Sequence, residues 1–159
     1  MKKIYIAGFD VFKPDSIEIG EVYKSTCREY GYEGLYPLDN QIDESWSKKV
    51  AREFIYKKNI ELIEMSDIVI ANGNPFRGDE LDSGTAFEIG YALALKKEVV
   101  IYMQDNRSYL QKSTCKAKKD VLLDKDGMFI EDFDFSLNLM FCECNIVKGG
   151  FKDAIKILY

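Results

Sequence analysis

The amino-acid sequence predicts an α/β fold in which a mainly parallel sheet carries helices on both faces. Short apolar segments rich in β-branched residues alternate with longer amphipathic segments along the chain, and this alternation is typical of parallel strands connected by helices. The chain has 159 residues, of which 47% are hydrophobic and 31% charged. This length and composition suit one domain, residues 1–159, built around a single core.

The first half of the chain is expected to contain three strands and two helices. Residues 67–72 (DIVIAN) form an almost uninterrupted apolar run, as a central parallel strand should. Residues 44–66 place apolar side chains at positions 46, 50, 54, 55, 62 and 63, which fits an amphipathic helix. The predicted strands are 2–8, 34–39 and 67–72, and the predicted helices are 13–32 and 44–66.

The second half of the chain begins with a loop and a helix. The loop 73–82 is rich in glycine, proline and aspartate, and the helix 83–97 has Asp82 or Ser83 as its expected N-cap. The later segments are a predicted strand at 98–103, a weakly patterned polar stretch at 104–126, short extended pieces at 127–133 and 138–144, and a closing helix at 149–159.

Charge and composition exclude several classes of partner. The net charge is −5 and the pI is about 4.9, so no nucleic-acid partner is expected. No apolar run is long enough to span a membrane. The apolar segment near the amino terminus is short and is interrupted by Asp10, which predicts a strand rather than a secretion signal. We therefore expect a cytoplasmic protein whose cysteines, Cys27, Cys115, Cys142 and Cys144, are free thiols.

The sequence contains no histidine. This excludes Ser-His-Asp and Cys-His nucleophile systems and histidine-ligated metal sites, so acid–base or nucleophilic chemistry falls mainly to carboxylates, tyrosines, lysines or cysteines. Neither glycine-rich phosphate-binding motif, G-x-G-x-x-G or G-x-x-x-x-G-K-[ST], is present. We expect no cofactor and no metal.

Three loops should meet where ligands bind in such sheets, at the carboxyl ends of the strands. They are Gly8 to Phe12, Asp39 to Gln41 and Gly73 to Asp82. The polar and aromatic side chains expected near this edge are Tyr5, Phe12, Asp39, Asn40, Gln41, Trp46, Asn59, Asp79, Asp82 and Glu88. Carboxylates and amides suit hydroxyl groups and the edges of heterocycles, and aromatic rings suit a flat base, so a nucleoside-like ligand is predicted.

Glu88 is the best candidate for a nucleophile, since it lies between Phe87 and Ile89 in a helix that otherwise reads as buried. A poorly hydrated carboxylate can attack an anomeric carbon. The simpler interpretations remain open at this stage. Glu88 would then be a surface glutamate, Asp82 only an N-cap, Trp46 a packing residue and Asn59 a solvent-exposed helix residue.

Four segments together resemble a known family. KIYIAGFDVF, PLDNQ, NPFRGDELDSGTAFEIGYALAL and NLM occur in this order, and the chain from residue 2 to Tyr159 is similar to the nucleoside 2-deoxyribosyltransferases. The resemblance implies a flavodoxin-like fold, a doubly wound five-stranded sheet. It also implies transfer of 2-deoxyribose between nucleobases through a covalent deoxyribosyl-glutamate on Glu88, with retention and with slow hydrolysis as a side reaction.

The resemblance also implies roles for other residues. Tyr5 would hold the nucleophile, Asp82 would bind sugar hydroxyls and Gln41 would contact the base. Asn138 and Met140 would come from a neighbouring subunit, which implies at least a homodimer with shared active sites, and Tyr159 would lie near the site. The predicted substrate-binding residues are Asp82, Gln41, Asn59, Asp39, Gly8, Phe12, Asn138, Met140 and Tyr159, and the predicted catalytic residues are Glu88 and Tyr5.

One position differs from the family pattern. Asn59 stands where several members have an aspartate that gives a proton to the leaving base, so the proton would have to come from Asp39, from a carboxylate such as Asp79, or from water. Two other functions stay open: a 2′-deoxynucleoside 5′-monophosphate N-glycosidase, which shares the fold and the glutamate, and a non-catalytic nucleoside-binding protein.

Overall fold

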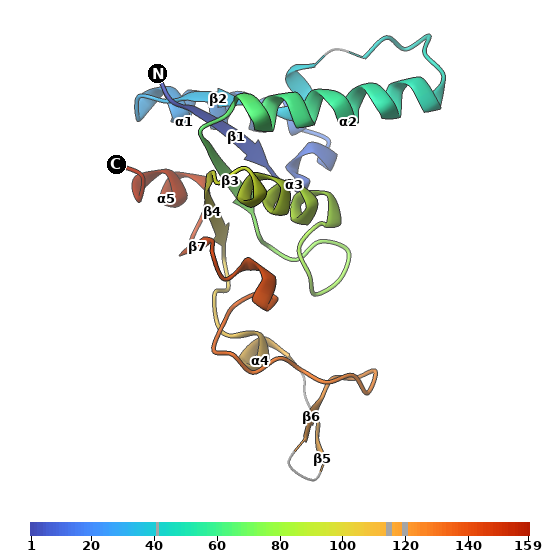
Figure 1. Cartoon of the computed structure of the whole chain (residues 1–159), viewed down its shortest axis with the longest axis vertical. Helices are drawn as coiled ribbons and strands as arrows, with labels where there is room; N and C mark the ends of the chain where they lie inside the picture. Colours follow the sequence, from blue (N-terminus) through green and yellow to red (C-terminus); the bar gives the residue numbers. More distant parts are fainter. Residues whose placement is uncertain (41, 114–115, 119–120) are drawn as a thin grey trace.

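The computed structural model describes residues 1–40, 42–113, 116–118 and 121–159 and contains the predicted sheet (Figure 1). Five strands pair in the order β2-β1-β3-β4-β7, and every pairing is parallel. The strands are β1 (Lys3–Ala7), β2 (Glu33–Leu35), β3 (Ile68–Asn72), β4 (Glu98–Met103) and β7 (Asn145–Lys148). This order is that of flavodoxin-like folds, so the predicted fold class is confirmed.

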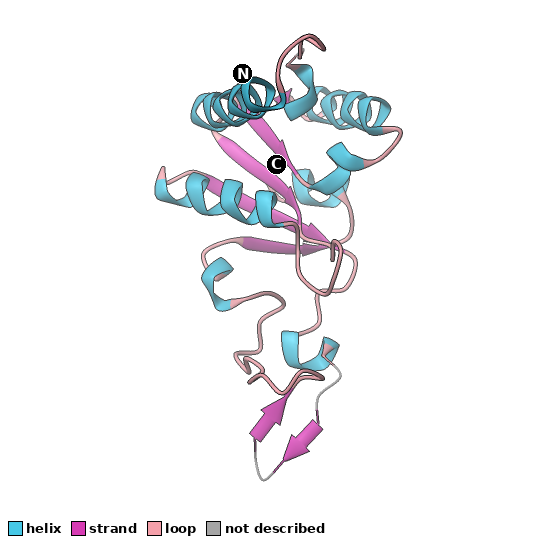
Figure 2. Cartoon of the chain, turned by 90° about the vertical axis from the view of Figure 1, so that its right-hand side faces the viewer, coloured by secondary structure: helices cyan, strands magenta, loops and turns pink. Residues whose placement is uncertain are grey.

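Helices cover both faces of the sheet (Figure 2). Successive residues of a strand point to opposite faces, so Ile4 and Ile6 of β1 pack with α1 and α5, whereas Tyr5 and Ala7 pack with α2 and α3. The four helices are α1 (Ser16–Glu29), α2 (Lys48–Met65), α3 (Ser83–Ala94) and α5 (Phe151–Lys156). Each overlaps a helix predicted from the sequence, and none of the described helices is apolar and long enough to cross a membrane.

Two short 3₁₀ turns follow the first two strands. The turn η1 (Phe9–Phe12) comes directly after β1, and η2 (Pro37–Asp39) comes after β2. Residues 37–39 were expected to continue the second strand, but the Asp39 side chain accepts the Tyr36 N–H at 3.1 Å and starts a turn there. Both turns therefore lie at the carboxyl edge of the sheet, where a ligand site was predicted.

The described residues between Met103 of β4 and Asn138 form an arm that extends away from the sheet (Figures 1 and 2). The arm contains α4 (Tyr109–Lys112) and an antiparallel pair, β5 (Lys116–Lys118) and β6 (Val121–Leu123). The sequence prediction of a weakly patterned polar stretch did not separate these elements.

The prediction of extended structure at 138–144 is wrong. The Asn138 side chain accepts the Met140 N–H at 3.0 Å and begins the 3₁₀ turn η3 (Leu139–Phe141). The last strand of the sheet is instead β7, which carries no fully buried residue and so lacks the apolar run that marked the central strands. In the other expected piece, 127–133, Phe129 forms an isolated bridge to Leu123.

Candidate active site

A cavity of about 290 Å³ opens at the carboxyl end of β1, between the two 3₁₀ turns and the helices α2 and α3. It is lined by Gly8, Val11, Phe12, Pro37, Leu38, Asn40, Ile42, Ile55, Asn59, Asp82, Gly84, Thr85 and Glu88. Past Asn59, Gly84 and Glu88 it continues into an apolar groove of about 250 Å³ between α2 and α3. The structure thus brings Gly8, Phe12, Asn40, Asn59, Asp82 and Glu88 together, as predicted from the sequence.

Gly8 allows the chain to turn from β1 into the cavity wall. Its φ is +152°, in the region that favours glycine, and a Cβ there would lie 2.7 Å from the Cβ of Asn72. The following turn, η1, presents Val11 and Phe12 to the cavity. Phe12 is 59% exposed and its ring stacks on Phe76 at a centroid distance of 5.4 Å, so it offers a supported aromatic face to a ligand.

Asp82 is the N-cap of α3. Its Oδ2 accepts hydrogen bonds from the Thr85 N–H at 2.9 Å and the Thr85 hydroxyl at 3.0 Å. The N-cap interpretation is therefore correct, and it does not compete with a role in binding, because Asp82 also lines the cavity. Carboxylate oxygens accept several hydrogen bonds each, so the same side chain can cap the helix and receive a hydroxyl of a ligand.

Glu88 is half-buried and is held by a tyrosine from the sheet. The Tyr5 hydroxyl donates a hydrogen bond to Glu88 Oε1 at 2.6 Å. Tyr5 is fully buried in β1, and its side chain points to the sheet face on which α3 packs. The carboxylate of Glu88 therefore has a fixed position at the wall of the cavity, which rules out a freely solvated surface glutamate.

The pKa of Glu88 is raised to about 7: burial raises it most, the hydrogen bond from Tyr5 lowers it, and the neighbouring charge of Asp82 raises it. The pKa of Tyr5 is also raised well above its ordinary value, by burial and by the charge of Glu88. Tyr5 therefore remains a hydrogen-bond donor at neutral pH. Glu88 changes its charge close to neutrality, as pKa tuning at catalytic carboxylates commonly requires.

Asn59 of α2 contributes an amide to the cavity wall. Its Oδ1 is buried and has no hydrogen-bond partner among the described residues. A buried polar atom without a partner is costly and is usually explained by a ligand or by function. The sequence-based alternative, a solvent-exposed residue, is wrong.

Among the residues expected near this edge of the sheet, Asp39, Trp46 and Asp79 do not line the cavity. The Asp39 carboxylate accepts hydrogen bonds from Lys24 at 2.5 Å and from the Tyr36 N–H at 3.1 Å. Trp46 packs edge-on against Phe54, with ring centroids 4.9 Å apart, which is the packing role considered as the simpler interpretation.

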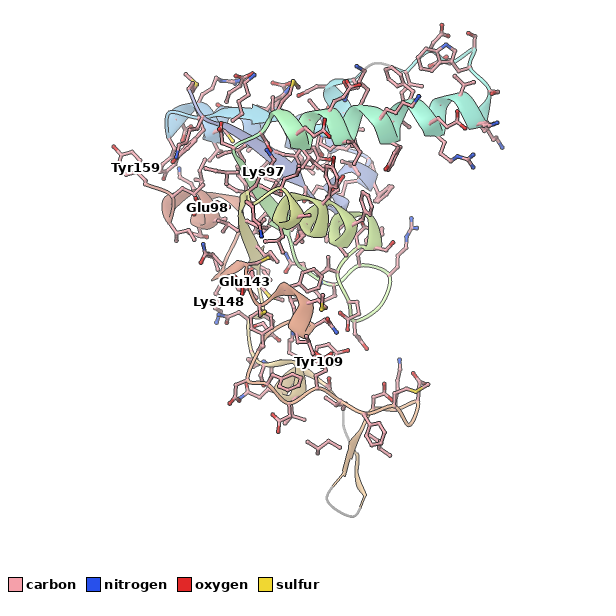
Figure 3. All side chains as sticks on the ribbon, in the orientation of Figure 1. Lys97, Glu98, Tyr109, Glu143, Lys148 and Tyr159 are labelled. Atoms are coloured by element: carbon pink, nitrogen blue, oxygen red, sulfur yellow. The ribbon has the colours of Figure 1, made fainter. Side chains whose placement is uncertain are left out.

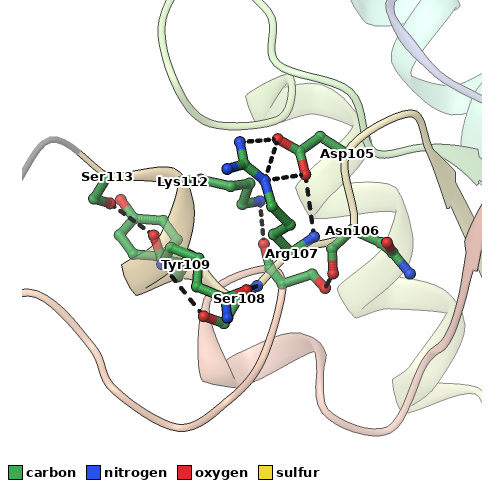
Figure 4. A network of polar contacts seen from close by, with 9 residues as sticks. Asp105, Asn106, Arg107, Ser108, Tyr109, Lys112 and Ser113 are labelled. Carbon is green, nitrogen blue, oxygen red and sulfur yellow. Dashed lines mark hydrogen bonds and ion pairs between the residues drawn. The ribbon is translucent and has the colours of Figure 1, made fainter.

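Asp79 lines a second cavity, also of about 290 Å³, at the base of the arm. The neighbouring network in Figure 4 pairs Arg107 with Asp105 at 2.7 Å and caps α4 with Ser108. Among the described residues, no group of three or more cysteine, aspartate or glutamate side chains is placed to hold a metal ion.

The residues that the resemblance assigned to the edge of the site do not reach it within one chain. Asn138 caps η3 and donates to Glu131 at 2.7 Å, and Met140 is 73% exposed. Tyr159 lies at the chain end (Figure 3) and packs edge-on against Tyr30, which ends α1 at the amino edge of the sheet. Tyr159 is therefore not near the cavity of its own chain. Gln41 lies outside the described residues.

Sequence reasoning missed the apolar part of the wall. Val11, Pro37, Leu38, Ile42 and Ile55 line the cavity beside the polar residues. One signal was present: Ile55 and Asn59 are four residues apart, which places them on one face of a helix. The other residues lie in 3₁₀ turns or in irregular chain, where no periodicity shows which side chains face inward.

Known proteins share sequence and fold with this chain. Residues 4–140 match the family model described as nucleoside 2-deoxyribosyltransferase. The solved structure of a 2-desoxiribosyltransferase from Leishmania mexicana is similar to the chain, with a TM-score of 0.82 and 32% sequence identity. That match covers 99% of this chain and 97% of the Leishmania chain.

Two further proteins are more distant. Protein C191.05c of Schizosaccharomyces pombe, of uncharacterised function, is 29% identical over 166 residues, which cover 93% of this chain and 79% of that protein. The CMP N-glycosidase BcmB of Clostridium botulinum is 17% identical with a TM-score of 0.52, over 99% of this chain and 98% of that chain, and shows likeness of fold alone. Because the family model spans most of its length, the chain belongs to the nucleoside 2-deoxyribosyltransferase family.

Proposed function

We propose that the protein transfers 2-deoxyribose from one nucleobase to another, with Glu88 as the nucleophile. The observation that carries this proposal is the half-buried Glu88 carboxylate, held by the Tyr5 hydroxyl at 2.6 Å in the wall of a cavity. The cavity is mostly apolar and has a few polar groups, as a site for a base and a sugar requires. The enzyme named in the Leishmania structure is a 2-desoxiribosyltransferase, which supports the same activity.

In the first step a carboxylate oxygen of Glu88 attacks C1′ of a 2′-deoxynucleoside. The C1′–N bond breaks, its electron pair leaves with the base, and the base takes up a proton. In the second step a nitrogen of another base attacks C1′, the C1′–O bond to Glu88 breaks, and the electron pair returns to the carboxylate. The attacking nitrogen gives up its proton to water. Two displacements at one carbon give overall retention. Water in place of the second base gives slow hydrolysis.

The other residues of the cavity bind and orient the substrate in this proposal. Asp82 accepts hydrogen bonds from sugar hydroxyls, and Phe12 and Asn59 contact the base. An amide cannot transfer a proton, Asp39 is bonded to Lys24, and Asp79 lies in the second cavity. Water therefore supplies the proton for the leaving base.

A partner subunit completes the site in this proposal. Met140 is 73% exposed and neither it nor Asn138 lines the cavity of its own chain. The groove that continues from Glu88 is flanked by the exposed rings of Tyr56 and Phe87. Association of two copies would cover this apolar surface and would bring Asn138 and Met140 to the neighbouring sugar pocket.

The test is a base-exchange assay with a 2′-deoxynucleoside donor and a different free base. Wild-type protein should form the new nucleoside, Glu88→Gln should lose this activity by several orders of magnitude, and the exposed Glu98→Gln should retain it. A 2-fluoro-2-deoxyribosyl adduct on Glu88 should be detectable by mass spectrometry. Full activity of Glu88→Gln would refute the assignment of the nucleophile.

The same assay separates the two alternatives. Cleavage of 2′-deoxynucleoside 5′-monophosphates without cleavage of nucleosides would identify an N-glycosidase and contradict the transferase proposal. The position of Asp82 disfavours this outcome, because its carboxylate at the start of α3 would repel a phosphate. Tight nucleoside binding with neither adduct nor turnover would identify a binding protein.

A further inference from the structure

Asp10 is a buried carboxylate that the proposed reaction does not use. It is 2% exposed and lies in η1, the turn that also contributes Val11 and Phe12 to the cavity. An isolated buried carboxylate is strongly unfavourable unless donors surround it. The described residues supply three hydrogen-bond donors and one ammonium group, and each comes from a different place in the fold.

The donors tie η1 to its surroundings. Asn72 Nδ2, at the end of β3, donates to Asp10 Oδ2 at 2.8 Å, and the Lys13 ammonium pairs with Oδ1 at 2.6 Å. The hydroxyls of Tyr23 and Tyr102 complete the set, each at 3.3 Å from Oδ2. The contacts with Asn72 and Lys13 are the shortest of the four, so they dominate.

Asn72 extends the network from η1 to the next loop. Its Oδ1 accepts hydrogen bonds from the Asn74 N–H at 3.1 Å and from Asn74 Nδ2 at 2.7 Å. Asn74 Oδ1 in turn accepts the Gln104 N–H at 2.8 Å, after β4. Since Asp10 only accepts and the Asn74 N–H only donates, one orientation of the Asn72 amide satisfies both. The carboxylate of Asp10 and the backbone N–H of Asn74 therefore require the same orientation of the Asn72 amide.

Aromatic contacts join the same two loops on their outer side. Phe76 stacks on Phe9 at a centroid distance of 5.0 Å and on Phe12 at 5.4 Å. The loop that holds Asn74 and Phe76 leads directly to Asp82 and α3. The position of Phe12 relative to Asp82 and Glu88 thus depends on how η1 is fastened to the end of β3.

We propose that Asp10, acting through Asn72, is a positioning residue that holds the η1 wall of the cavity in its binding-competent place. It touches no reacting atom. The proposal rests on the proposed function, because it assigns the base-binding wall to Phe12. When Asp10 is lost, η1 samples positions in which Phe12 does not meet the base. The apparent affinity for substrate then falls in proportion to the fraction of molecules that remain in the competent state.

The decisive variant is Asp10→Asn. The amide keeps the shape of the carboxylate but turns one acceptor into a donor that faces other donors. We expect KM for a 2′-deoxynucleoside to rise about tenfold or more, since a hydrogen bond to a charged group is lost. kcat should change less than about threefold, because saturating substrate selects the competent position. The share of hydrolysis relative to transfer should rise as the wall admits water.

A matched control separates positioning from general loss of stability. Asp153 likewise pairs with a lysine, Lys156 at 2.9 Å, and it accepts the Gly150 N–H at 3.1 Å, but it lies in α5 away from the cavity. Asp153→Asn should lower the melting temperature without raising KM. If Asp10→Asn lowers the melting temperature and leaves KM and the product ratio unchanged, Asp10 is merely structural and the proposal is overturned.

Hydrogen exchange decides the proposal even if the protein has no transferase activity. In Asp10→Asn, amides of residues 9–13 should exchange about tenfold faster or more, while those of α3 stay protected as in the wild type. Uniformly faster exchange, or no change in η1, would overturn the positioning role. If the wild type is inactive but Asp10→Asn speeds exchange only in η1, the proposed function is refuted and the positioning role stands.

Discussion

At the scale of single residues, Glu88 shows how burial and function combine. The helix α3 turns Thr85, Ile89 and Ala92 toward the sheet, where they are buried. Glu88 lies beside this buried face, at the point where β1 ends and the cavity begins, so it can meet both Tyr5 and a ligand. The sequence singled out this carboxylate because of its apolar neighbours, and the structure supplies the reason for them.

The pH dependence of exchange should report the ionisation of Glu88. Its pKa is about 7, and only the carboxylate is a nucleophile, so kcat/KM should fall about tenfold per unit as pH drops below this value. A profile from pH 5 to 8 checks this expectation, and a midpoint near the ordinary value of 4.5 would contradict it. The raised pKa also means that the folded state binds this proton more tightly, so the free energy of unfolding should decrease as pH rises from about 4.5 to 7.

Two variants should move this midpoint in opposite directions. The Tyr5 hydrogen bond lowers the pKa of Glu88, so Tyr5→Phe should shift the midpoint of the pH profile to higher pH. The Asp82 charge raises the pKa of Glu88, so Asp82→Asn should shift the midpoint to lower pH. Asparagine still caps α3 in this variant. Asp82→Asn should also raise KM through weaker binding of sugar hydroxyls. Shifts of both midpoints in the same direction would show that the ionisation of another group sets the pH dependence.

Asn59→Leu should stabilise the folded protein and weaken substrate binding. The buried Oδ1 has no partner among the described residues, so its replacement by an apolar side chain should raise the free energy of unfolding by about 1 kcal/mol. KM should rise because the amide no longer contacts the base. Urea unfolding and steady-state kinetics measure the two effects, and a destabilised variant would mean that Oδ1 is bonded in solution.

At the scale of elements, the predictions succeeded where one residue pattern dominated. The central strands β3 and β4 are apolar over nearly their whole length, and α2 has a clear helical period, so their positions were predicted within a few residues. The edge strand β7 was missed because it has no fully buried residue. The turn η1 was missed because a single polar residue, Asp10, anchors it through contacts 13 to 92 positions away in the sequence.

Two glycines in helices should respond in opposite ways to alanine. A Cβ on Gly20 of α1 would lie 2.5 Å from the Tyr36 ring, whereas a Cβ on Gly90 of α3 meets nothing within 4 Å. Gly90→Ala should stabilise the protein by about 0.5–1 kcal/mol through helix propensity. Gly20→Ala should destabilise it by about 1–3 kcal/mol through overpacking. Thermal unfolding of both variants checks the contrast, and equal effects would show that α1 can shift away from Tyr36.

At the scale of the whole molecule, the arm exposes apolar side chains that contacts within one chain do not cover. It extends away from the sheet (Figure 1) and carries exposed apolar residues, among them Phe129 at 82% and Phe133 at 65% exposure. Monomers rarely expose many large apolar side chains together without a partner. This agrees with the proposal that η3, which follows the arm, completes the site of a second copy.

Complementation between inactive variants tests this shared site. Glu88→Ala and Asn138→Ala should each be nearly inactive alone. Mixed in equal amounts and allowed to exchange subunits, they should recover about a quarter of wild-type activity, because half of the random dimers carry one intact site out of two. Activity that equals the sum of the separate variants would place all site residues on one chain.

The sequence by itself determined the central strands and main helices, the exclusion of histidine chemistry, and the choice of Glu88 and Asp82. The strands, the helices and the missing histidine depend on local periodicity and residue type, and the choice of Glu88 and Asp82 rested also on the resemblance to a known family. Only the tertiary structure decided that Tyr5 meets Glu88, that Asn59 faces the cavity and that Asp39 turns to Lys24 instead. Such contacts join residues 15 to 83 positions apart, and only the packing of sheet and helices brings side chains so distant in the sequence together.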